Sequence, residues 1–416
     1  MPLQVDFLIV GSGLTGATIA RTLVDAGCEV LVLERRNHVG GNVHDHLHPS
    51  GIRIHTYGPH YFRTNSEEIW RFVNRFSTFF PYEAVVKTLI DDKLEQWPVA
   101  AQYISREVGS VHASTLDKNP NNFEEACLAM MPQLVYEKFV RGYTEKQWGT
   151  SAKSLSSKLA SRFEVRQSSD PRFSEHKHQG IPRGGYSEFS RRLLDGVPVL
   201  LNCDFLKTRD YFQARKILIF TGAIDEFFSH DLGKLDYRAQ RREHLFLENV
   251  ANVQPCGQVN NPSPERGTHI RTLEWKHMMP ADQAAGITGT VITREHPYTA
   301  QNSDNYEYPF PDERNQTLYE AYRSRVAGHD RLMICGRLGE YRYFDMDQAI
   351  GRALRMAREI LRSSPLPHRQ VAPRYRTHEA LLMDAGKTLI ETRADCRGAD
   401  LAVRPAILNL RSNPVE

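Results

Sequence analysis

A glycine-rich turn near the start of the chain constrains the fold more than any other feature of the sequence. An apolar run of strand length leads directly into Gly11, Gly13 and Gly16, which have the spacing Gly-x-Gly-x-x-Gly. A helical pattern follows, and after it a second apolar run ends on Glu34. In such a βαβ unit the glycines permit a tight turn, close approach of a pyrophosphate and close packing of helix on strand. The sequence therefore predicts a dinucleotide-binding site of the Rossmann type.

The residues around this turn indicate how a dinucleotide would be held. The first residues of the predicted helix, Leu14 and Thr15, would offer free N–H groups to the pyrophosphate, and Glu34 would accept hydrogen bonds from the ribose hydroxyls. Glu34 is followed by Arg35 and then by a second glycine-rich turn, Gly40-Gly41-Asn42. This order is similar to the FAD-binding variant of the fold, in which the second turn lies close to the cofactor. We therefore expect FAD, with NAD as the alternative.

Composition, charge and cysteine usage exclude several classes of protein. A chain of 416 residues, 40% hydrophobic and 25% charged, has an ordinary globular composition, and its length predicts two or three domains. The net charge of +3 favours neither nucleic acid nor a membrane as partner. No apolar run approaches the ~18 residues of a spanning helix, and the first one is the nucleotide-binding strand rather than a signal peptide. The six scattered cysteines fit free thiols in a reducing cytosol, so we expect a cytoplasmic protein, with a homodimer left open.

The remaining chain predicts two further parts around this unit. Helical spacing dominates from about 103 to 159, and alternating patterns dominate from 237 to 294. An apolar run at 332–338 and a helix predicted over 347–362 return to the nucleotide. We expect an α/β fold: a Rossmann-type FAD-binding domain with an inserted helical subdomain and an antiparallel sheet domain. The expected division is an FAD-binding domain over 1–80, 191–230 and 326–363, sheet-domain strands over 81–100, a helical subdomain over 101–165, a sheet or substrate loop over 166–190, an antiparallel substrate domain over 231–325, and a C-terminal extension over 364–416.

Several residues have both a structural and a functional interpretation on spacing alone. His60 lies beyond a Gly-Pro break, where a loop could direct it at a cofactor, but a histidine in an apolar stretch is as often structural. Tyr143 and Trp148 could stack on a nucleobase, although their spacing favours helix core. Gly222 follows a predicted strand and suits a return to the cofactor. Three alternating histidines within 44–48 favour an exposed hairpin over a metal site, and no metal is expected.

Later motifs carry a more specific resemblance. The chain resembles the UDP-galactopyranose mutases, flavoenzymes that interconvert the pyranose and furanose forms of a nucleotide-bound sugar. The resemblance covers roughly residues 4–363, and its middle and late motifs are the most specific. The motifs are Gly11-Ser12-Gly13-Leu14 with Gly16, Arg36-Asn37-His38-Val39-Gly40-Gly41-Asn42, Gly142-Tyr143-Thr144-Glu145-Lys146-Gln147-Trp148-Gly149, Gln179-Gly180-Ile181-Pro182, Gly336-Arg337-Leu338 with Glu340-Tyr341, and Tyr343-Phe344-Asp345-Met346.

This resemblance implies a role for each matching position. Arg162 and Arg271 would hold the diphosphate of the substrate and His60 would lie beside the flavin, so these three are the expected catalytic residues. The other substrate-binding residues that it implies are Phe139 and Tyr143 at the base, Trp148 and Phe173 at the sugar, Asn260 or Asn261 near the sugar, and Tyr308 and Tyr343 at the diphosphate. The cofactor-binding residues would be Gly11, Gly13, Leu14, Thr15, Gly16, Glu34, Arg35, Gly41, Asn42, His60, Gly222, Arg337, Tyr343, Asp345 and Met346.

The resemblance also implies the chemistry. The N5 atom of reduced FAD would attack the anomeric carbon of the sugar and expel the nucleoside diphosphate. The resulting flavin–sugar adduct would open, a different hydroxyl would close the ring, and the diphosphate would return to the anomeric carbon as the bond to the flavin breaks. No net redox change occurs, so the protein needs only to orient the reactants and to stabilise charge. The expected enzyme is an isomerase that acts on a nucleotide sugar of the UDP-galactose type.

Departures from the family's usual residues gather near the expected sugar pocket. Pro59 and Arg63 stand where alanine and histidine are usual, Phe173 replaces a tyrosine, and Ala84 falls where a polar residue is usual. They make a deoxy- or N-acetyl sugar on UDP, TDP or GDP an alternative to UDP-galactose. Two other classes of protein also remain open. One is a flavin oxidoreductase of the amine oxidase type, and the other is a binding protein without catalysis.

Overall fold

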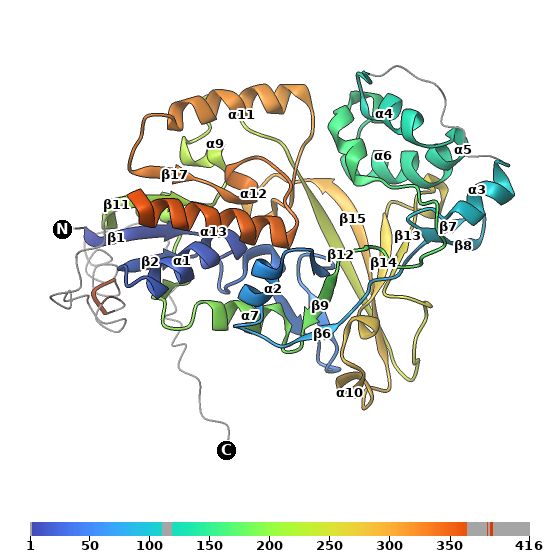
Figure 1. Cartoon of the computed structure of the whole chain (residues 1–416), viewed down its shortest axis with the longest axis horizontal. Coiled ribbons are helices and arrows are strands. Elements are labelled where there is room, and N and C mark those ends of the chain that lie inside the picture. Colours follow the sequence, from blue (N-terminus) through green and yellow to red (C-terminus); the bar gives the residue numbers. More distant parts are fainter. Residues whose placement is uncertain (1, 110–118, 364–380, 382, 386–416) are drawn as a thin grey trace, which may run out of the picture.

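The computed structural model describes residues 2–109, 119–363, 381 and 383–385. Both glycine-rich turns and all the later motifs lie within these residues. Nearly all of the expected C-terminal extension, 364–416, lies outside them. Figure 1 shows a sheet with flanking helices on one side of the molecule, a second sheet on the other side, and a group of short helices beside the second sheet.

The predicted βαβ unit forms the centre of a five-stranded parallel sheet. Because helices flank a parallel sheet, its strands are continuous apolar runs, and all four residues of β2 are buried. All the strands point the same way, so their carboxyl ends meet at one edge, where such sheets bind ligands. The strand order is β10-β2-β1-β11-β17, with β1 Leu3–Val10, β2 Val30–Leu33, β10 Val199–Leu200, β11 Phe212–Phe220 and β17 Leu332–Ile334.

Helices from distant parts of the chain pack on this sheet. α1 Leu14–Asp25 packs against α13 Met346–Ser363, and α7 Gly185–Leu193 lies beside α1 (Figure 1). α11 Glu313–Val326 contacts α9 Ile224–Phe227 and the edge strand β17. The buried face of α13 repeats at helical spacing, as the sequence predicted. It includes Ile350, Ala353, Leu354, Ala357 and Ile360.

The second sheet has seven strands in the order β16-β12-β15-β14-β13-β7-β8. Its pairs are antiparallel except β13–β7, which is parallel. These two strands come from segments on either side of the helical region. A turn at Asp91-Asp92 joins β7 to β8, and both residues have positive φ. The expected class, α/β with a separate antiparallel sheet, is confirmed. The strands are β7 Val86–Ile90, β8 Lys93–Trp97, β12 Tyr237–Leu247, β13 Gln258–Asn260, β14 Arg271–Glu274, β15 Thr290–Thr299 and β16 Tyr308–Pro309.

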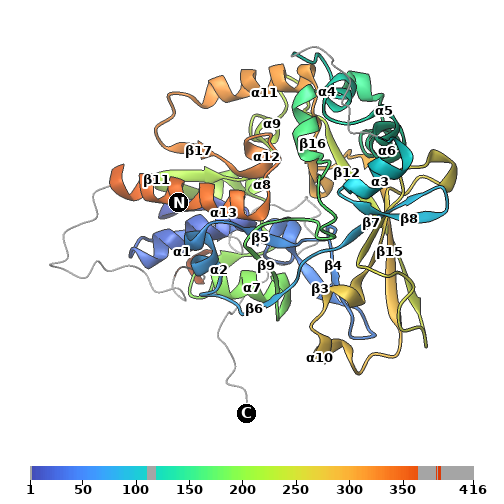
Figure 2. The same cartoon turned by 45° about the vertical axis from the view of Figure 1, so that its right-hand side comes forward.

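The helical region has a core of its own and consists of short elements (Figure 2). Asn122 caps α4, and its side chain accepts a hydrogen bond from Glu125 N at 3.0 Å. The long helical pattern is divided because Pro132 begins a new helix and Gly149 ends the last one in the left-handed conformation. The elements are α3 Ala101–Glu107, α4 Phe123–Met130, α5 Gln133–Val135, a π-helix Tyr136–Arg141, α6 Gly142–Trp148, and 3₁₀ helices Ala152–Ser154 and Ser157–Arg162.

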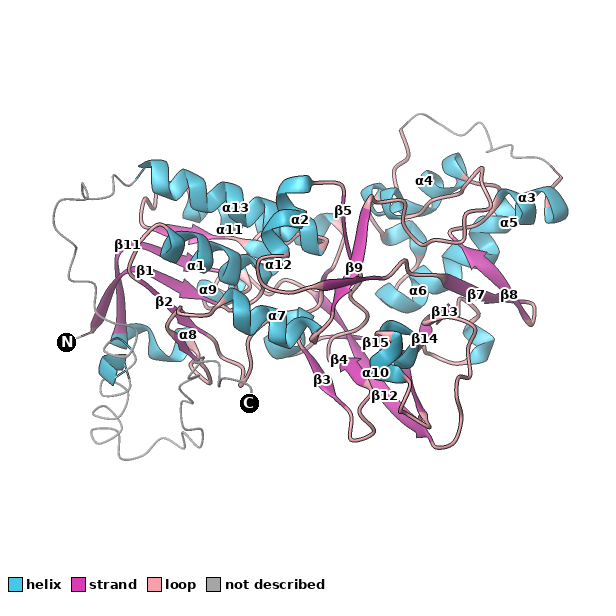
Figure 3. Cartoon of the chain, turned by 60° about the horizontal axis from the view of Figure 1, so that its bottom comes forward, coloured by secondary structure: helices cyan, strands magenta, loops and turns pink. Residues whose placement is uncertain are grey.

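Short strands connect these parts (Figure 3). The Gly58-Pro59 break lies between β4 and β5, so His60 lies in a loop, as expected. The antiparallel pair β3–β4 forms the hairpin expected around the alternating histidines. Within the described residues, no helix is long and apolar enough to cross a membrane. The connecting elements are β3 Asp45–Leu47, β4 Arg53–His55, β5 Phe62–Thr64, α2 Glu67–Val73, β6 Phe79–Pro81 and β9 His178–Pro182.

Candidate active site

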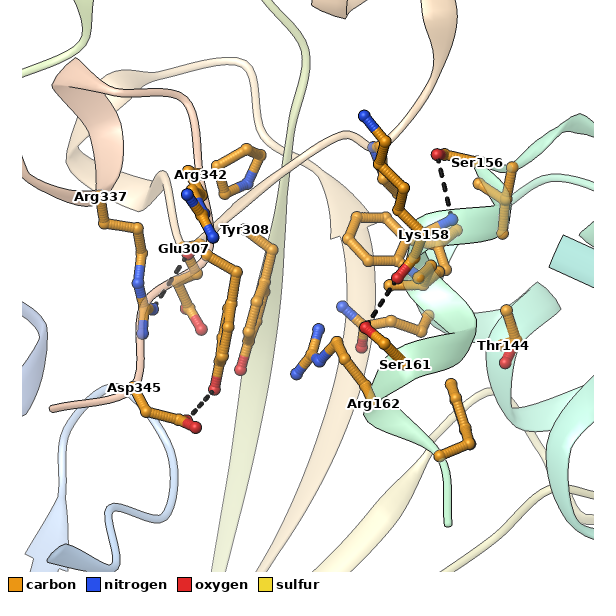
Figure 4. Close-up of a pocket in the computed structure, with 18 of the residues that line it drawn as sticks. Thr144, Ser156, Lys158, Ser161, Arg162, Glu307, Tyr308, Arg337, Arg342 and Asp345 are labelled. Carbon is orange, nitrogen blue, oxygen red and sulfur yellow. Dashed lines mark hydrogen bonds between the residues drawn. The ribbon is translucent and has the colours of Figure 1, made fainter. Parts of the chain in front are cut away.

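A cavity of about 2010 Å³ lies where the parallel sheet, the antiparallel sheet and the helical region meet (Figure 4). It is larger than the roughly 300–1,000 Å³ of most small-molecule pockets, so it has room for a nucleotide sugar and the reactive end of a cofactor. Many of the residues expected at the site line this cavity. They are Asn42, His60, Phe139, Tyr143, Trp148, Arg162, Phe173, Asn260, Arg271, Tyr308, Arg337, Tyr343, Asp345 and Met346.

The first glycine-rich turn is closely packed except at its second glycine. A Cβ on Gly11 would lie 2.1 Å from Thr221 Oγ1, and one on Gly16 would lie 2.1 Å from Gly11 O. A Cβ on Gly41, in the second turn, would lie 2.9 Å from Gly13 Cα. A Cβ on Gly13, in contrast, would meet Gly41 Cα at an ordinary 3.9 Å. The protein therefore leaves open the one glycine whose backbone a pyrophosphate approaches in this type of turn.

The acidic residue after β2 connects the phosphate turn to the ribose side. Glu34 is 5% exposed, and its Oε2 accepts hydrogen bonds from the N and Oγ atoms of Ser12 at 2.9 and 2.6 Å. Its Oε1 accepts one from Arg36 N at 2.9 Å. A carboxylate offers about four acceptor sites, so Oε1 can also accept a ribose hydroxyl. Arg35 bonds to Ser303 Oγ and Ser303 O, each at 2.9 Å.

Other expected cofactor residues surround the same turn. Leu14 and Thr15 begin α1, and a Cβ on Gly336 would lie 3.3 Å from Thr15 Oγ1. Gly222 follows Thr221, whose Oγ1 donates to Val10 O at 2.7 Å. The late motif therefore reaches the N-terminus of α1, and the end of β11 reaches the end of β1. Two distant segments thus enclose the phosphate turn.

His60 carries an unsatisfied atom where the cofactor-binding parts meet the cavity. Its Nδ1 is buried and has no hydrogen-bond partner among the described residues. Burial lowers the pKa of His60 well below its ordinary value, so the ring is neutral at physiological pH. The chain fixes the loop here, because His60 N donates to His55 Nδ1 at 3.0 Å and Tyr186 Oη donates to His60 O at 3.0 Å. An open phosphate turn and an orphaned ring nitrogen beside the cavity fit a flavin dinucleotide.

The late motif supplies the opposite wall. Arg337 donates to Phe344 O at 2.8 Å, and its guanidinium lies 4.7 Å from the ring centroid of Tyr343. Tyr343 Oη donates to Asp345 Oδ1 at 3.2 Å (Figure 4), and Arg63 donates to Asp345 Oδ2 at 3.1 Å. Met346 then begins α13. These contacts hold the late motif against the loop that carries His60.

The two expected arginines line the same cavity from different elements. Arg162 ends the 3₁₀ helix of the helical region, and its guanidinium lies 4.0 Å from the ring centroid of Tyr343. It is exposed, and no carboxylate partner is found for it among the described residues. Arg271 begins β14 and is held by Glu295, to which its Nε donates. A dianionic group in the cavity can therefore reach two guanidinium groups, a pair suited to a diphosphate.

A buried charge network fixes Arg271. Arg242 Nε donates to Glu295 at 2.8 Å, and its Nη atoms donate to Glu307 at 2.9 and 2.8 Å. Burial alone would lower the pKa of Arg271, but the Glu295 carboxylate outweighs it and holds that pKa well above the ordinary value. Among the described contacts Arg271 bonds only through Nε, so its Nη groups remain available to an anion. The pKa of Glu307 is raised, chiefly by burial.

Aromatic residues form the end of the cavity under the helical region. Phe139 is 2% exposed and Trp148 is 5% exposed, so both contribute mainly to the core, as their spacing favoured. Trp97, at the end of β8, lines the cavity and stacks on Phe139 with ring centroids 6.3 Å apart and an interplanar angle of 22°. Sequence analysis missed Trp97, which only the fold brings next to Phe139. Tyr143 lines the same cavity, and burial raises its pKa, so its hydroxyl stays protonated.

The structure separates the two neighbouring asparagines of the expected sugar site. Asn260, in β13, lines the cavity. Asn261 is held in its own loop, where its Nδ2 donates to Arg266 O and His269 O at 3.3 and 3.1 Å. Phe173 also lines the cavity, and the Arg63 guanidinium lies 5.2 Å from its ring centroid. Ala84, 3% exposed, pairs with this segment through the bond from Phe173 N to Ala84 O.

Comparisons with known proteins agree with this geometry. The model of the UDP-galactopyranose mutase family matches residues 138–343, and that of the NAD(P)-binding Rossmann-like domain matches residues 9–76. A probable UDP-galactopyranose mutase of Klebsiella pneumoniae is 31% identical, covering 86% of this chain and 95% of that protein. A dTDP-fucopyranose mutase of Escherichia coli is 30% identical, covering 86% and 98%. A crystal structure of reduced UDP-galactopyranose mutase aligns with a TM-score of 0.69 at 14% identity, covering 92% of this chain and 98% of that one.

Fold and site together define a protein with a Rossmann-type domain and a large cavity that two arginine side chains line. A putrescine oxidase shares the scaffold at a TM-score of 0.55 and 13% identity, so the scaffold alone does not decide the chemistry. The sequence matches do: the chain belongs to the UDP-galactopyranose mutase family, which makes it an isomerase that acts on nucleotide sugars.

Proposed function

We propose that this enzyme interconverts the pyranose and furanose forms of a nucleotide sugar with FAD in its reduced state. The observation that carries the proposal is the placement of Arg162 and Arg271 on one cavity that also reaches His60, beside the dinucleotide cradle. An oxidoreductase on this scaffold has no need of two guanidinium groups in a cavity outside its phosphate turn. The exposed Arg162 and the buried Arg271 together match the charge of a nucleoside diphosphate.

The residues of the chain account for each task that such a reaction requires. Reduced flavin supplies a nucleophilic nitrogen with no net redox change. Arg162 and Arg271 would hold the diphosphate and stabilise the charge it gains as its bond to the sugar breaks. Burial raises the pKa of Tyr308 to about 12, so its hydroxyl would remain a hydrogen-bond donor to the same group. Walls from three parts of the molecule would exclude water, so that the separated diphosphate returns to the sugar.

The proposal covers several sugars and several bases. UDP-galactose is one candidate, and deoxy- or N-acetyl sugars on UDP, TDP or GDP are the others. The similarity to a dTDP-fucopyranose mutase at 30% identity, almost equal to that of the galactose enzyme, supports keeping both. The apolar ring of Phe173, which lines the cavity, also favours a sugar that carries fewer hydroxyl groups on that side.

A panel assay tests this function. Purified flavin-containing protein, reduced with dithionite, is incubated with UDP-, TDP- and GDP-linked hexoses, 6-deoxyhexoses and N-acetylhexosamines, and furanose products are separated by chromatography. We expect turnover of at least one member by the reduced enzyme and none by the oxidised enzyme, which is the control. Failure of every member with reduced holoenzyme, or a steady requirement for an electron acceptor, would contradict the proposal.

Replacing Arg162 by alanine is expected to lower kcat/KM by about 10- to 100-fold, because a hydrogen bond to a charged group contributes about 1.5–3 kcal/mol. Arg162 is exposed and pairs with no described carboxylate, so the folded state loses little. The control is Arg141→Ala, which removes an exposed cation from the same region outside the cavity and should leave kinetics unchanged. Equal kinetics for the two variants would remove Arg162 from the diphosphate site.

A further inference from the structure

A chain of three buried polar side chains runs along the floor of the cavity. Tyr61 Oη donates to Gln258 Oε1 at 3.1 Å, and Gln258 Nε2 donates to Asn260 Oδ1 at 2.9 Å. All three residues line the cavity, and Gln258 and Asn260 are each 7% exposed. We call this chain the Tyr61–Gln258–Asn260 relay. None of its hydrogen bonds is needed to complete a sheet or to cap a helix, which points to a task in the cavity.

The position of the relay matches the place of the sugar. Tyr61 directly follows His60, the residue beside the cofactor cradle. At the other end, Asn260 lies directly opposite Arg271 in the β13–β14 pair. Gln258 and Asn260 are two residues apart on one strand, so their side chains share a face. The relay therefore spans the distance between the cofactor side and the diphosphate side of the cavity, where the sugar of a bound nucleotide sugar has to lie.

The relay has a direction that its first member sets. The hydroxyl hydrogen of Tyr61 has Gln258 Oε1 as its acceptor, and Gln258 is thereby left to donate through Nε2 to Asn260 Oδ1. Reversing both amides would make Tyr61 Oη an acceptor and turn its hydrogen away from the chain, so the Tyr61 hydroxyl donates within the relay only in the observed direction. Among the described residues no hydrogen bond to Asn260 Nδ2 is found, and Asn260 borders the cavity. Its two N–H groups therefore remain for a ligand.

An aromatic wall stands beside this row of donors. The ring of Tyr61 lies 5.7 Å from that of Tyr82 and 6.3 Å from that of Phe173, the latter edge to face. Burial raises the pKa of Tyr61 well above its ordinary value, so its hydroxyl keeps the proton that orients the relay. The floor of the cavity thus offers hydrogen-bond donors from Asn260 and apolar surface from the rings of Tyr61 and Phe173, both of which line the cavity.

We propose that the relay determines which sugar the enzyme accepts. Asn260 donates to an acceptor oxygen of the sugar, either a hydroxyl or an acetamido carbonyl, while Gln258 and Tyr61 act as positioning residues that hold the Asn260 amide in the donating orientation. This inference rests on the proposed function, because it takes the ligand to be a nucleotide sugar. It goes further by assigning the polarity of the recognition and the two residues that set it.

Two substitutions test the direction of the relay. Gln258→Glu replaces the amide by a carboxylate, which only accepts hydrogen bonds, so Asn260 should turn its N–H groups toward Glu and present oxygen to the sugar. Tyr61→Phe removes the hydroxyl that sets the direction. The matched control is Tyr82→Phe, because Tyr82 is also buried beside Tyr61 but takes no part in the relay. Folding is checked for each by flavin content and thermal unfolding.

The readout compares a nucleotide sugar with its free nucleoside diphosphate, both measured as dissociation constants by thermal protection. We expect the nucleotide sugar to bind about 3- to 10-fold more weakly to Tyr61→Phe and about 10- to 100-fold more weakly to Gln258→Glu. Binding of the nucleoside diphosphate and the behaviour of Tyr82→Phe should stay within about twofold of wild type. Unchanged sugar binding in folded Tyr61→Phe, or equal losses for sugar and diphosphate, would overturn the relay.

This design separates the relay from the mutase activity. Binding is measured without turnover, so wild-type protein that binds nucleotide sugars but converts none contradicts the proposed function and leaves the relay to be decided by the variants. Wild-type protein that turns over a sugar, together with variants that lose no sugar selectivity, contradicts the relay alone. Among active enzymes, the relay predicts a raised KM with a nearly unchanged kcat for Tyr61→Phe, because the reacting atoms keep their partners.

Discussion

Replacing Arg271 by methionine is expected to lower the turnover of the preferred nucleotide sugar by on the order of 10³-fold or more, the range in which single arginines act on phosphoryl groups. The buried Arg271 is oriented by Glu295 before substrate binds, so its remaining donors need no rearrangement to meet a diphosphate. Its loss falls mainly on kcat, since the charge that it stabilises is largest when the diphosphate has left the sugar. The measurement is steady-state kinetics with reduced enzyme.

The fold should tolerate this change. Removing one partner of a buried pair usually leaves an uncompensated charge, but here Glu295 keeps Arg242 at 2.8 Å, and Glu307, whose pKa burial raises, can take up a proton to balance the network. Methionine also replaces the aliphatic stem. Arg241→Met is the control, because Arg241 lies on the same sheet with an exposed side chain that pairs with Glu243. If Arg271→Met retained more than about a tenth of wild-type turnover with intact flavin content, the diphosphate would not be held by this arginine, and an oxidoreductase would become the better interpretation.

The parts of the fold that the sequence predicted are those whose signals are local. The first βαβ unit, the hairpin around the alternating histidines and the helix predicted over 347–362 each depend on residues close in the chain, and all three are present. The inserted helical region was predicted as helical but not as a set of short elements. Its division depends on Pro132 and Gly149, whose individual effects a spacing pattern averages out.

Most of the site residues were predicted from the resemblance to a known family and not from spacing. Spacing alone left His60 undecided and favoured a core role for Trp148, which is indeed buried. The polar floor of the cavity was not found, because Tyr61 and Gln258 are 197 residues apart and only the fold joins them. The same holds for Arg242, Glu295 and Glu307, which come from three separate segments and together with Arg271 form one buried charge network. The sequence did hold one usable pattern: Gln258 and Asn260 are two residues apart in β13, which places both polar side chains on the same face of the strand.

These observations divide the cavity into regions with separate physical tasks. Under the proposed function, charge would govern the end that holds the diphosphate, where Glu295 orients Arg271 and Arg162 completes the pair from the helical region. Hydrogen-bond direction would govern the floor beneath the sugar, and stacking would govern the end near Trp97. Substitutions in two different regions should therefore have nearly additive effects on the binding free energy, because sites without shared partners couple weakly.

Replacing Gly16 by alanine is expected to yield protein without flavin. Its Cβ would lie 2.1 Å from Gly11 O, a backbone atom that cannot move without displacing β1 from α1. The helix N-terminus would then lose its position under the pyrophosphate. Flavin content is measured as the ratio of flavin to protein absorbance. The control is Gly286→Ala, at a site with open space and an unstrained φ, which should keep a full complement.

Gly13→Ala separates loss of the cofactor from loss of the fold. Gly13 has φ −65° and ψ 176°, which alanine adopts freely, and its Cβ would meet Gly41 Cα at 3.9 Å, so the protein without cofactor should unfold at the wild-type temperature. A pyrophosphate lying on the Gly13 backbone would clash with the new methyl group, and overpacking of this kind costs about 1–3 kcal/mol, or roughly 5- to 150-fold in FAD affinity. Titration of FAD into stripped wild-type and variant protein measures this difference. Equal affinities would place the pyrophosphate away from Gly13 and would require another site for the cofactor.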